Sequence, residues 1–166
     1  ASYRLELDDK IELLEEIVDP MILPPLTPRP DLELRVIHEE EDFVVIEKPT
    51  GMLMHPARAS DDATLVHALI AHYPEIEKVG ESEWRPGVMQ RLDKEASGLV
   101  VIARNKKSYK HLKDQFKEHN ILKEYDVLVE GEMVKDDGTV DLPIGRAKGS
   151  GKMSAHTQAA DKDRPA

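Results

Sequence analysis

The strongest structural signal in this chain lies in one segment, Arg85-Pro-Gly-Val-Met-Gln-Arg-Leu-Asp-Lys-Glu-Ala-Ser-Gly-Leu-Val-Val-Ile-Ala-Arg104. It opens with the turn dipeptide Pro86-Gly87 and closes with residues 99–103, an apolar, β-branched run that predicts a strand buried on both faces. The polar loop between them presents a carboxylate, Asp93, on irregular backbone anchored to a rigid strand. Reactive side chains are often held in this way.

The residues of this loop permit two interpretations. In the first, Asp93 caps a turn through its own backbone and Arg91 is a solvated surface charge, which is the more frequent situation for an acid in a loop. In the second, Asp93 is a reactive carboxylate and Arg91 is its cationic neighbour. Motifs elsewhere in the chain favour the second.

Four motifs occur in order between residues 42 and 153. They are Asp42-Phe-Val-Val-Ile-Glu-Lys-Pro-Thr-Gly-Met-Leu-Met-His-Pro56, Arg91-Leu-Asp-Lys-Glu-Ala-Ser-Gly-Leu-Val-Val-Ile-Ala103, Lys123-Glu-Tyr-Asp-Val-Leu-Val-Glu-Gly131, and Leu142-Pro-Ile-Gly-Arg146 with Lys152-Met153. In this order they resemble the motifs of the RluA-type RNA pseudouridine synthases. The chain departs from that pattern at Gln90, where histidine is usual, and at Ala96, where threonine is common.

The resemblance implies an isomerase that converts specific uridines to pseudouridine in ribosomal RNA, most often of the large subunit, or in transfer RNA. No cofactor or metal is expected. Asp93 would be the catalytic carboxylate, and whether it attacks the sugar or the base, or promotes elimination, stays open. Arg91 would hold Asp93 ionised or fill the vacated stack. Tyr125 would stack on the uracil, although from the residues alone it is more simply a cross-strand aromatic.

Two other functions remain as alternatives. A catalytically inactive RNA-binding protein of the same fold would bind without turnover, but the joint presence of Asp93, Arg91 and Tyr125 favours an enzyme. A carboxylate hydrolase such as a glycosidase needs a second positioned acid, for which Glu95 and Asp126 are candidates only by proximity in sequence.

The composition excludes several classes of protein. The 166 residues, 40% of them hydrophobic, suffice for one compact domain, and no apolar run is long enough to span a membrane. The chain has no cysteine, which excludes disulfides and a thiolate nucleophile and is compatible with the cytoplasm, where we expect the protein. His67 and His72 are five residues apart and do not share a helix face as a zinc pair would.

The net charge of −10 is unusual for an RNA-binding protein, because Lys and Arg must neutralise phosphates. The acids are concentrated, however, since residues 1–48 hold 14 acids against 5 basic residues. Residues 49–166 therefore carry a net charge of only about −1. Basic runs there are either solvated faces or RNA contacts, and the candidate contacts are Lys107, Lys110, Lys113, Arg146 and Lys152.

The patterning predicts an α+β fold, a mixed and mostly antiparallel β-sheet with flanking helices. Expected are a half-buried strand over residues 31–38, a buried strand over 43–46, an amphipathic helix over 62–73 with Asp62 as its N-cap, and a second helix over 106–118 capped by Asn105. Residues 121–130 predict a strand that the turn 136–139 pairs with residues 140–142. Residues 145–166 have little periodicity and predict a mobile loop.

Three parts are expected along the chain. Residues 1–18 weakly resemble the tail of an S4-like RNA-binding domain, residues 19–30 form a proline-rich linker or extended arm, and residues 31–166 are the N-terminal part of the catalytic domain. By resemblance, the sheet would continue beyond Ala166 with strands that carry another basic active-site residue. We therefore expect a fragment, incomplete at its C-terminus and inactive by itself.

Overall fold

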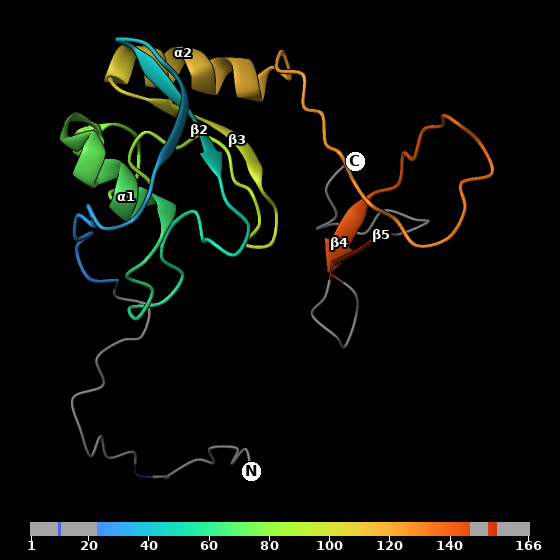
Figure 1. The fold of residues 1–166 in the computed structure, drawn as a ribbon, viewed down its shortest axis with the longest axis horizontal. Coiled ribbons are helices and arrows are strands. Elements are labelled where there is room, and N and C mark those ends of the chain that lie inside the picture. The colour runs from blue at the N-terminus through green and yellow to red at the C-terminus, as the bar shows by residue number, and fades with distance from the viewer. Residues whose placement is uncertain (1–9, 11–22, 147–152, 156–166) are drawn as a thin grey trace. The chain divides into compact units, whose positions relative to one another are not determined.

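The computed structural model describes residues 10, 23–146 and 153–155, which fall into two units, Ala1–Lys123 and Glu124–Ala166 (Figure 1). Each unit is treated by itself. The prediction for residues 1–18 lies outside the described residues, apart from Lys10. The division into a linker and a catalytic domain that begins near residue 31 stays a prediction.

The first unit is built on a three-stranded antiparallel sheet of order β1-β2-β3, formed by Arg35–Glu39, Phe43–Lys48 and Gly98–Ala103. A tight acidic turn joins β1 to β2, and the Glu40 N–H donates to the Phe43 carbonyl at 2.9 Å. β2 and β3 pair so that Val44 lies opposite Ile102 and Ile46 opposite Val100. The predicted α+β fold with an antiparallel sheet is thereby confirmed.

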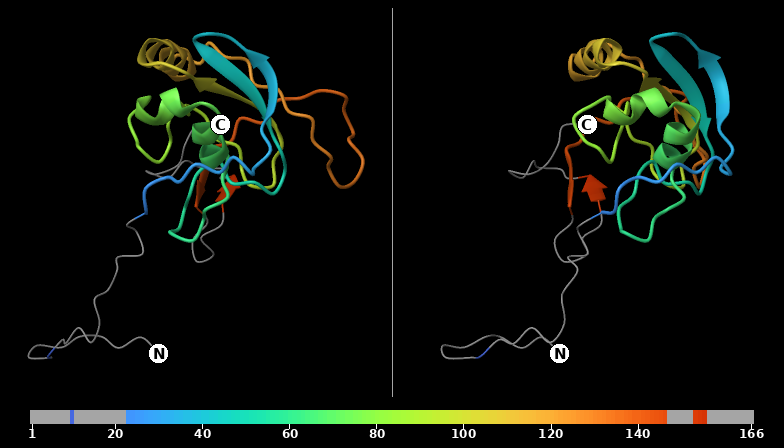
Figure 2. Two further views of the ribbon diagram at one scale, coloured as in Figure 1. Left: turned by 60° about the vertical axis from the view of Figure 1, so that its left-hand side comes forward. Right: turned by 90° about the vertical axis from the view of Figure 1, so that its left-hand side faces the viewer.

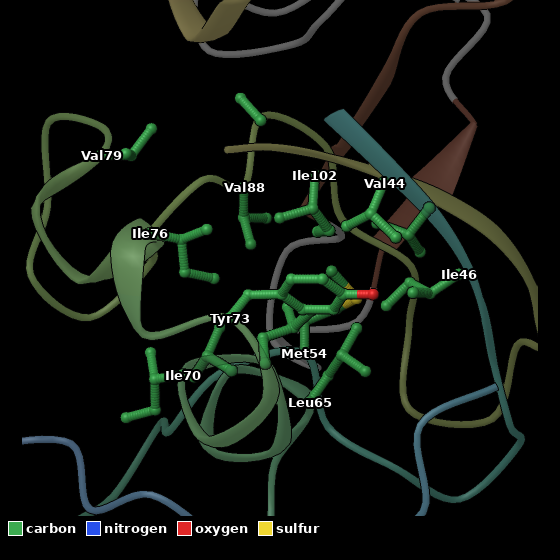
Figure 3. Close-up of a cluster of buried hydrophobic side chains, with 14 residues drawn as sticks. Val44, Ile46, Met54, Leu65, Ile70, Tyr73, Ile76, Val79, Val88 and Ile102 are labelled. Carbon is green, nitrogen blue, oxygen red and sulfur yellow. The ribbon is translucent and has the colours of Figure 1, made fainter. Parts of the chain in front are cut away.

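Two α-helices and a 3-10 turn cover one face of this sheet (Figure 2). They are α1, η1 and α2, at Leu65–His72, Pro74–Lys78 and Lys106–Lys117. Their side chains enclose the cluster drawn in Figure 3, with Tyr109 and Leu112 of α2 packed against it. No helix in the described part of the chain is long and apolar enough to cross a bilayer.

The helix caps follow local side-chain chemistry. Asn105 caps α2 as predicted, because its Oδ1 accepts the Ser108 N–H at 2.9 Å. α1 begins later than predicted, with Thr64 rather than Asp62 as N-cap. Thr64 Oγ1 lies 2.8 Å from His67 Nδ1, so His67 belongs to the cap. The predicted apolar residues are buried, but so are all residues from Leu65 to Ile70, and α1 is a core helix rather than an amphipathic one.

The burial predicted for the strands is wrong in part. Of the half-buried strand predicted over residues 31–38, only the part from Arg35 on forms a strand, β1, and it is exposed throughout, whereas Leu34 before it packs against the core. β2 alternates between buried and half-buried residues, because helices cover only one of its faces. β3 is an edge strand, and Leu99 on its uncovered face is 59% exposed instead of buried.

The chain from residue 121 onward, most of it in the second unit, departs most from prediction. Residues 121–130 and 140–142 form neither the predicted strands nor a hairpin, and Leu122, Val127 and Leu128 are at least 75% exposed. A strand persists only when a neighbour completes its hydrogen-bond ladder, and no described strand pairs with this segment. Within the predicted mobile loop, β4 (Ile144–Arg146) pairs instead with β5 (Met153–Ala155) as a short antiparallel ladder.

The described residues of the proline-rich segment, 23–30, make contacts with the first unit, while their role as a linker or an extended arm stays a prediction. Leu26 packs against the core, and the Arg29 N–H donates to the His67 carbonyl at 3.0 Å. The Arg29 guanidinium also binds Asp31 at 2.7 Å. The prolines leave few N–H groups that need partners, so an extended segment can lie along α1 without joining the sheet.

Candidate active site

Asp93 lies on an exposed tight turn, closed by the Ala96 N–H donating to the Asp93 carbonyl at 3.1 Å. The backbone before the loop is fixed at Gly87, whose φ of 69° and close approach to β3 exclude a side chain: a Cβ there would lie 2.5 Å from the Ala103 carbonyl oxygen. The backbone after it enters β3 at Gly98. Asp93 is therefore held between two fixed points with its side chain in solvent.

Lys48 clamps this turn from the core. It is the last residue of β2 and is fully buried, and its ammonium donates to the carbonyls of Pro49, Met52 and Lys94 at 2.8, 2.9 and 3.3 Å. Burial lowers its pKa, and the nearby carboxylates of Glu95 and Asp93 oppose that shift. Lys48 is therefore not a solvated surface charge, because three carbonyls accept hydrogen bonds from its ammonium.

The loop after β2 adds two further bonds to the same turn. The Gly51 N–H donates to the Lys94 carbonyl at 2.8 Å, and Thr50 Oγ1 donates to the Glu95 carbonyl at 2.8 Å. Gln90, one of the two departures from the family pattern, lies before the turn, and its side-chain amide donates to the Leu99 carbonyl at 3.1 Å. The first and second sequence motifs thus form one hydrogen-bonded structure that carries Asp93.

His55 lies in the loop that follows β2 and is half-buried. Its Nδ1 is buried and has no hydrogen-bond partner among the described residues. Burial, and then the positive charges of Arg85 and Arg91, lower its pKa to about 4. The ring is therefore neutral at physiological pH.

This arrangement predicts a pH dependence of stability. Because the folded pKa of His55 is about 4 and the ordinary value is 6.5, the unfolded chain binds more protons between these values. The contribution of neutral His55 is fully present above pH 6.5 and is lost as pH falls to about 4. In urea titrations, the free energy of unfolding of His55→Gln should fall by about 1 to 2 kcal/mol less than that of wild type over this pH interval. This value allows for partial exposure of the ring to solvent.

His67 also has a lowered pKa and adds to the acid sensitivity of both proteins, so the difference between them isolates His55. His72→Gln, at an exposed position, is the matched control and should follow wild type. Equal acid sensitivity of His55→Gln and wild type would contradict the assignment.

The other predicted site residues are distributed over both units. Arg91 is exposed and forms no ion pair with Asp93 among the described residues. Tyr125 is 61% exposed and belongs to the second unit, as does Asp126, so their relation to Asp93 stays a prediction. Arg146 lies in β4.

The predicted basic contacts differ in their exposure and in whether they form ion pairs. Lys107 and Lys110 are exposed on α2. Lys113 forms an ion pair with Glu81, whose hydrogen bond is the main cause of a raised lysine pKa. Lys152 lies outside the described residues. Of the three predicted contacts on α2, Lys107 and Lys110 thus have no ion pair among the described residues, whereas Lys113 has one.

Sequence reasoning missed Lys48 as part of the site. A signal was present, because Val44, Ile46 and Lys48 share one face of a strand with period two, and that face is the buried one. A lysine in the buried register of a strand must find acceptors, and a carbonyl-rich loop is the usual source.

Chemically, the site presents the Asp93 carboxylate on a rigid turn, with the Glu95 carboxylate two residues later on the same turn. No cluster of three or more possible metal ligands occurs in the part of the chain that the structure describes. Such a site can place a nucleophile or a base against a substrate that approaches from solvent.

This chain is similar in sequence to known proteins. The profile of the RNA pseudouridylate synthase family matches residues 42–165. An uncharacterized RNA pseudouridine synthase of Aquifex aeolicus is 42% identical over 123 residues, 74% of this chain and 39% of that protein. The ribosomal large subunit pseudouridine synthase D of Pseudomonas aeruginosa is 38% identical over 116 residues, 70% of this chain and 35% of that protein.

Among solved structures, human RNA pseudouridylate synthase domain containing 1 shares the fold, with a TM-score of 0.62 and 24% identity over 80% of this chain and 49% of that one. The chain spans less than half the length of the curated relatives named above. The family profile nevertheless covers most of this chain, including the Lys48 loop and the Asp93 turn. The chain belongs to the RNA pseudouridylate synthase family.

Proposed function

We propose that this chain carries the catalytic turn of an RNA pseudouridine synthase, with Asp93 as the catalytic carboxylate. One observation supports this most. The Asp93 side chain is exposed, while the carbonyls of its turn accept hydrogen bonds from Lys48, Thr50 and Gly51. A carboxylate that only capped a turn would not need such bracing. Preorganised backbone is what a reacting group requires, because small displacements are costly in rate.

The reaction needs no external reagent. The glycosidic bond from N1 of uracil to the ribose breaks, the base turns, and a bond from C5 forms, while the C5 proton is lost and N1 gains one. A single carboxylate can start this by attack or by promoting elimination. The target base must leave its stack to reach Asp93 or come from an open loop. Arg91 would fill the vacated space or support the carboxylate, and Tyr125 would stack on the base.

The proposed substrate is ribosomal RNA of the large subunit, with transfer RNA as the alternative, and the proposed compartment is the cytoplasm. The relative from Pseudomonas aeruginosa is among several that are named for the large ribosomal subunit, which supports the first choice. The direct experiment maps pseudouridine in total RNA from cells that lack the gene and from cells that regain it. Loss and recovery at a defined uridine is the expected result. An unchanged map, with RNA binding intact, would favour the non-catalytic alternative.

RNA binding should depend on the free lysines of α2. The double variant Lys107→Glu with Lys110→Glu should weaken RNA binding most at low salt and flatten the dependence of affinity on salt, because phosphate contacts release counterions. Fluorescence anisotropy with a labelled RNA measures both. Lys78→Glu with Lys135→Glu has the same change of charge at exposed positions and should have the smaller effect. Equal slopes for the two double variants would show that this face of α2 is only solvated.

A further inference from the structure

The segment that leads into the Asp93 turn first runs along the edge of β3 that faces away from β2. The Ala103 N–H donates to the Gly87 carbonyl at 2.9 Å, and Val88 forms an antiparallel bridge with Ile102. In the described part of the chain, no further bridge joins this segment to β3. Beyond Val88, the N–H and C=O groups on this edge of β3 therefore need other partners.

The side chain of Gln90 supplies such a partner. If the ladder continued in the register of the Val88 bridge, the Leu99 carbonyl would accept the backbone N–H of Arg91. In the structure, Gln90 Nε2 donates to that carbonyl instead, at 3.1 Å. A glutamine amide is the same kind of donor as a peptide N–H. The main chain can therefore leave the ladder here while the carbonyl of β3 stays satisfied.

This bond closes the base of the loop that carries Asp93. It joins two residues that are nine positions apart, and Arg91 and Asp93 lie between them. Met89 and Leu92 pack against the core, but apolar packing has no preferred direction and does not fix the path of the backbone. Among the described residues, the Gln90 bond is thus the directed contact that ties the entering arm of the loop to β3.

We propose that Gln90 is a positioning residue for the reaction at Asp93. Its bond to the Leu99 carbonyl fixes the direction in which the chain approaches Asp93, while the bonds from Lys48 and Thr50 hold the other end of the turn. The inference rests on the proposed function. It concerns a residue particular to this chain, because Gln90 stands where the family pattern usually has histidine.

Gln90→Met tests the bond, because methionine fills similar space and has no N–H donor. In the complete gene product, the single-turnover rate of pseudouridine formation should fall about threefold to tenfold, as expected for a small displacement of a catalytic group, while the Kd for RNA is unchanged. A second measurement does not depend on activity. By NMR, the Ala96 N–H, which closes the Asp93 turn, should exchange with solvent faster than in wild type, because the loop opens more often.

Two further variants show whether the donor is the cause. Gln90→His restores an N–H donor of similar reach and should recover most of the lost rate and the slow exchange of Ala96. Gln115→Met makes the methionine substitution at another half-buried glutamine, whose amide lies 2.8 Å from His111 Nε2 on α2. It should leave both measurements as in wild type. All rates are compared at a temperature at which thermal melts show every variant to be folded.

A folded Gln90→Met protein with the wild-type single-turnover rate would overturn the positioning role. A loss of rate that Gln90→His does not recover would overturn it as well, because the N–H donor would then not be the cause. The proposed function can fail separately. If Gln90→Met speeds the exchange of Ala96 and Gln90→His restores it, but the wild-type gene product forms no pseudouridine, closure of the loop by Gln90 stands and the proposed catalytic function falls.

Discussion

Asp93→Asn is expected to abolish pseudouridine formation by the complete gene product, with a loss of at least about a thousandfold in single-turnover rate. The change removes the proposed nucleophile or base and hardly alters side-chain volume. The Asp93 side chain is exposed and the turn is held by backbone carbonyls, so the fold should be unaffected. Affinity for RNA should also stay within a few-fold of wild type, since phosphate contacts dominate it. The measurement is release of the C5 tritium label from uridine in RNA.

Glu95→Gln is the matched control for this variant. Glu95 occupies the same exposed turn two residues later, and its carbonyl, not its side chain, accepts the bond from Thr50. Under the proposed function it should retain activity within a few-fold. Turnover by Asp93→Asn above the level of contaminating wild type would refute the assignment. Equal losses in both variants, with free uracil as product, would point instead to a hydrolase with paired acids.

The elements that sequence predicted best are those fixed by neighbouring residues. Asn105 marks the start of α2 because its side chain needs only the N–H of Ser108. The strand after the Asp93 turn was predicted because β-branched residues fill it, and the structure begins it at Gly98. The exposed carboxylate itself could be found from the loop alone, whereas its role depended on the resemblance to a family.

The parts that sequence did not predict depend on contacts between distant residues. The strand expected over residues 121–130 has the right composition, but without a described partner its backbone is not paired. The exposure of Leu99 follows from the position of β3 at a sheet edge, which alternation alone does not reveal. The hydrogen bond that holds the Asp93 turn joins Lys48 to Lys94, 46 residues away. Local patterning therefore indicates only that Lys48 lies on the buried face of its strand.

Removal of the Lys48 ammonium, which holds the Asp93 turn, is expected to have the second large effect. Lys48→Met should lower the free energy of unfolding by about 2 to 4 kcal/mol, because three part-buried carbonyls lose a charged donor and the relieved cost of burying the ammonium offsets that loss only in part. Methionine fills similar space, so a cavity is not the cause. Urea titration of the 166-residue chain measures the loss.

The same change should reduce activity beyond what unfolding explains. Lys48 does not reach solvent, so under the proposed function we expect it to act as a positioning residue, through its bond to the Lys94 carbonyl. At a temperature where Lys48→Met is fully folded, single-turnover rate should fall by tenfold or more, on the order expected when a catalytic group is displaced by a fraction of an ångström, while affinity for RNA is kept. Lys94→Met makes the same substitution at an exposed side chain and leaves the accepting carbonyl in place, so it should lose neither stability nor rate. A folded Lys48→Met with wild-type rate would mean that the clamp only stabilises the fold, and that Asp93 is positioned well enough by Thr50, Gly51 and the turn itself.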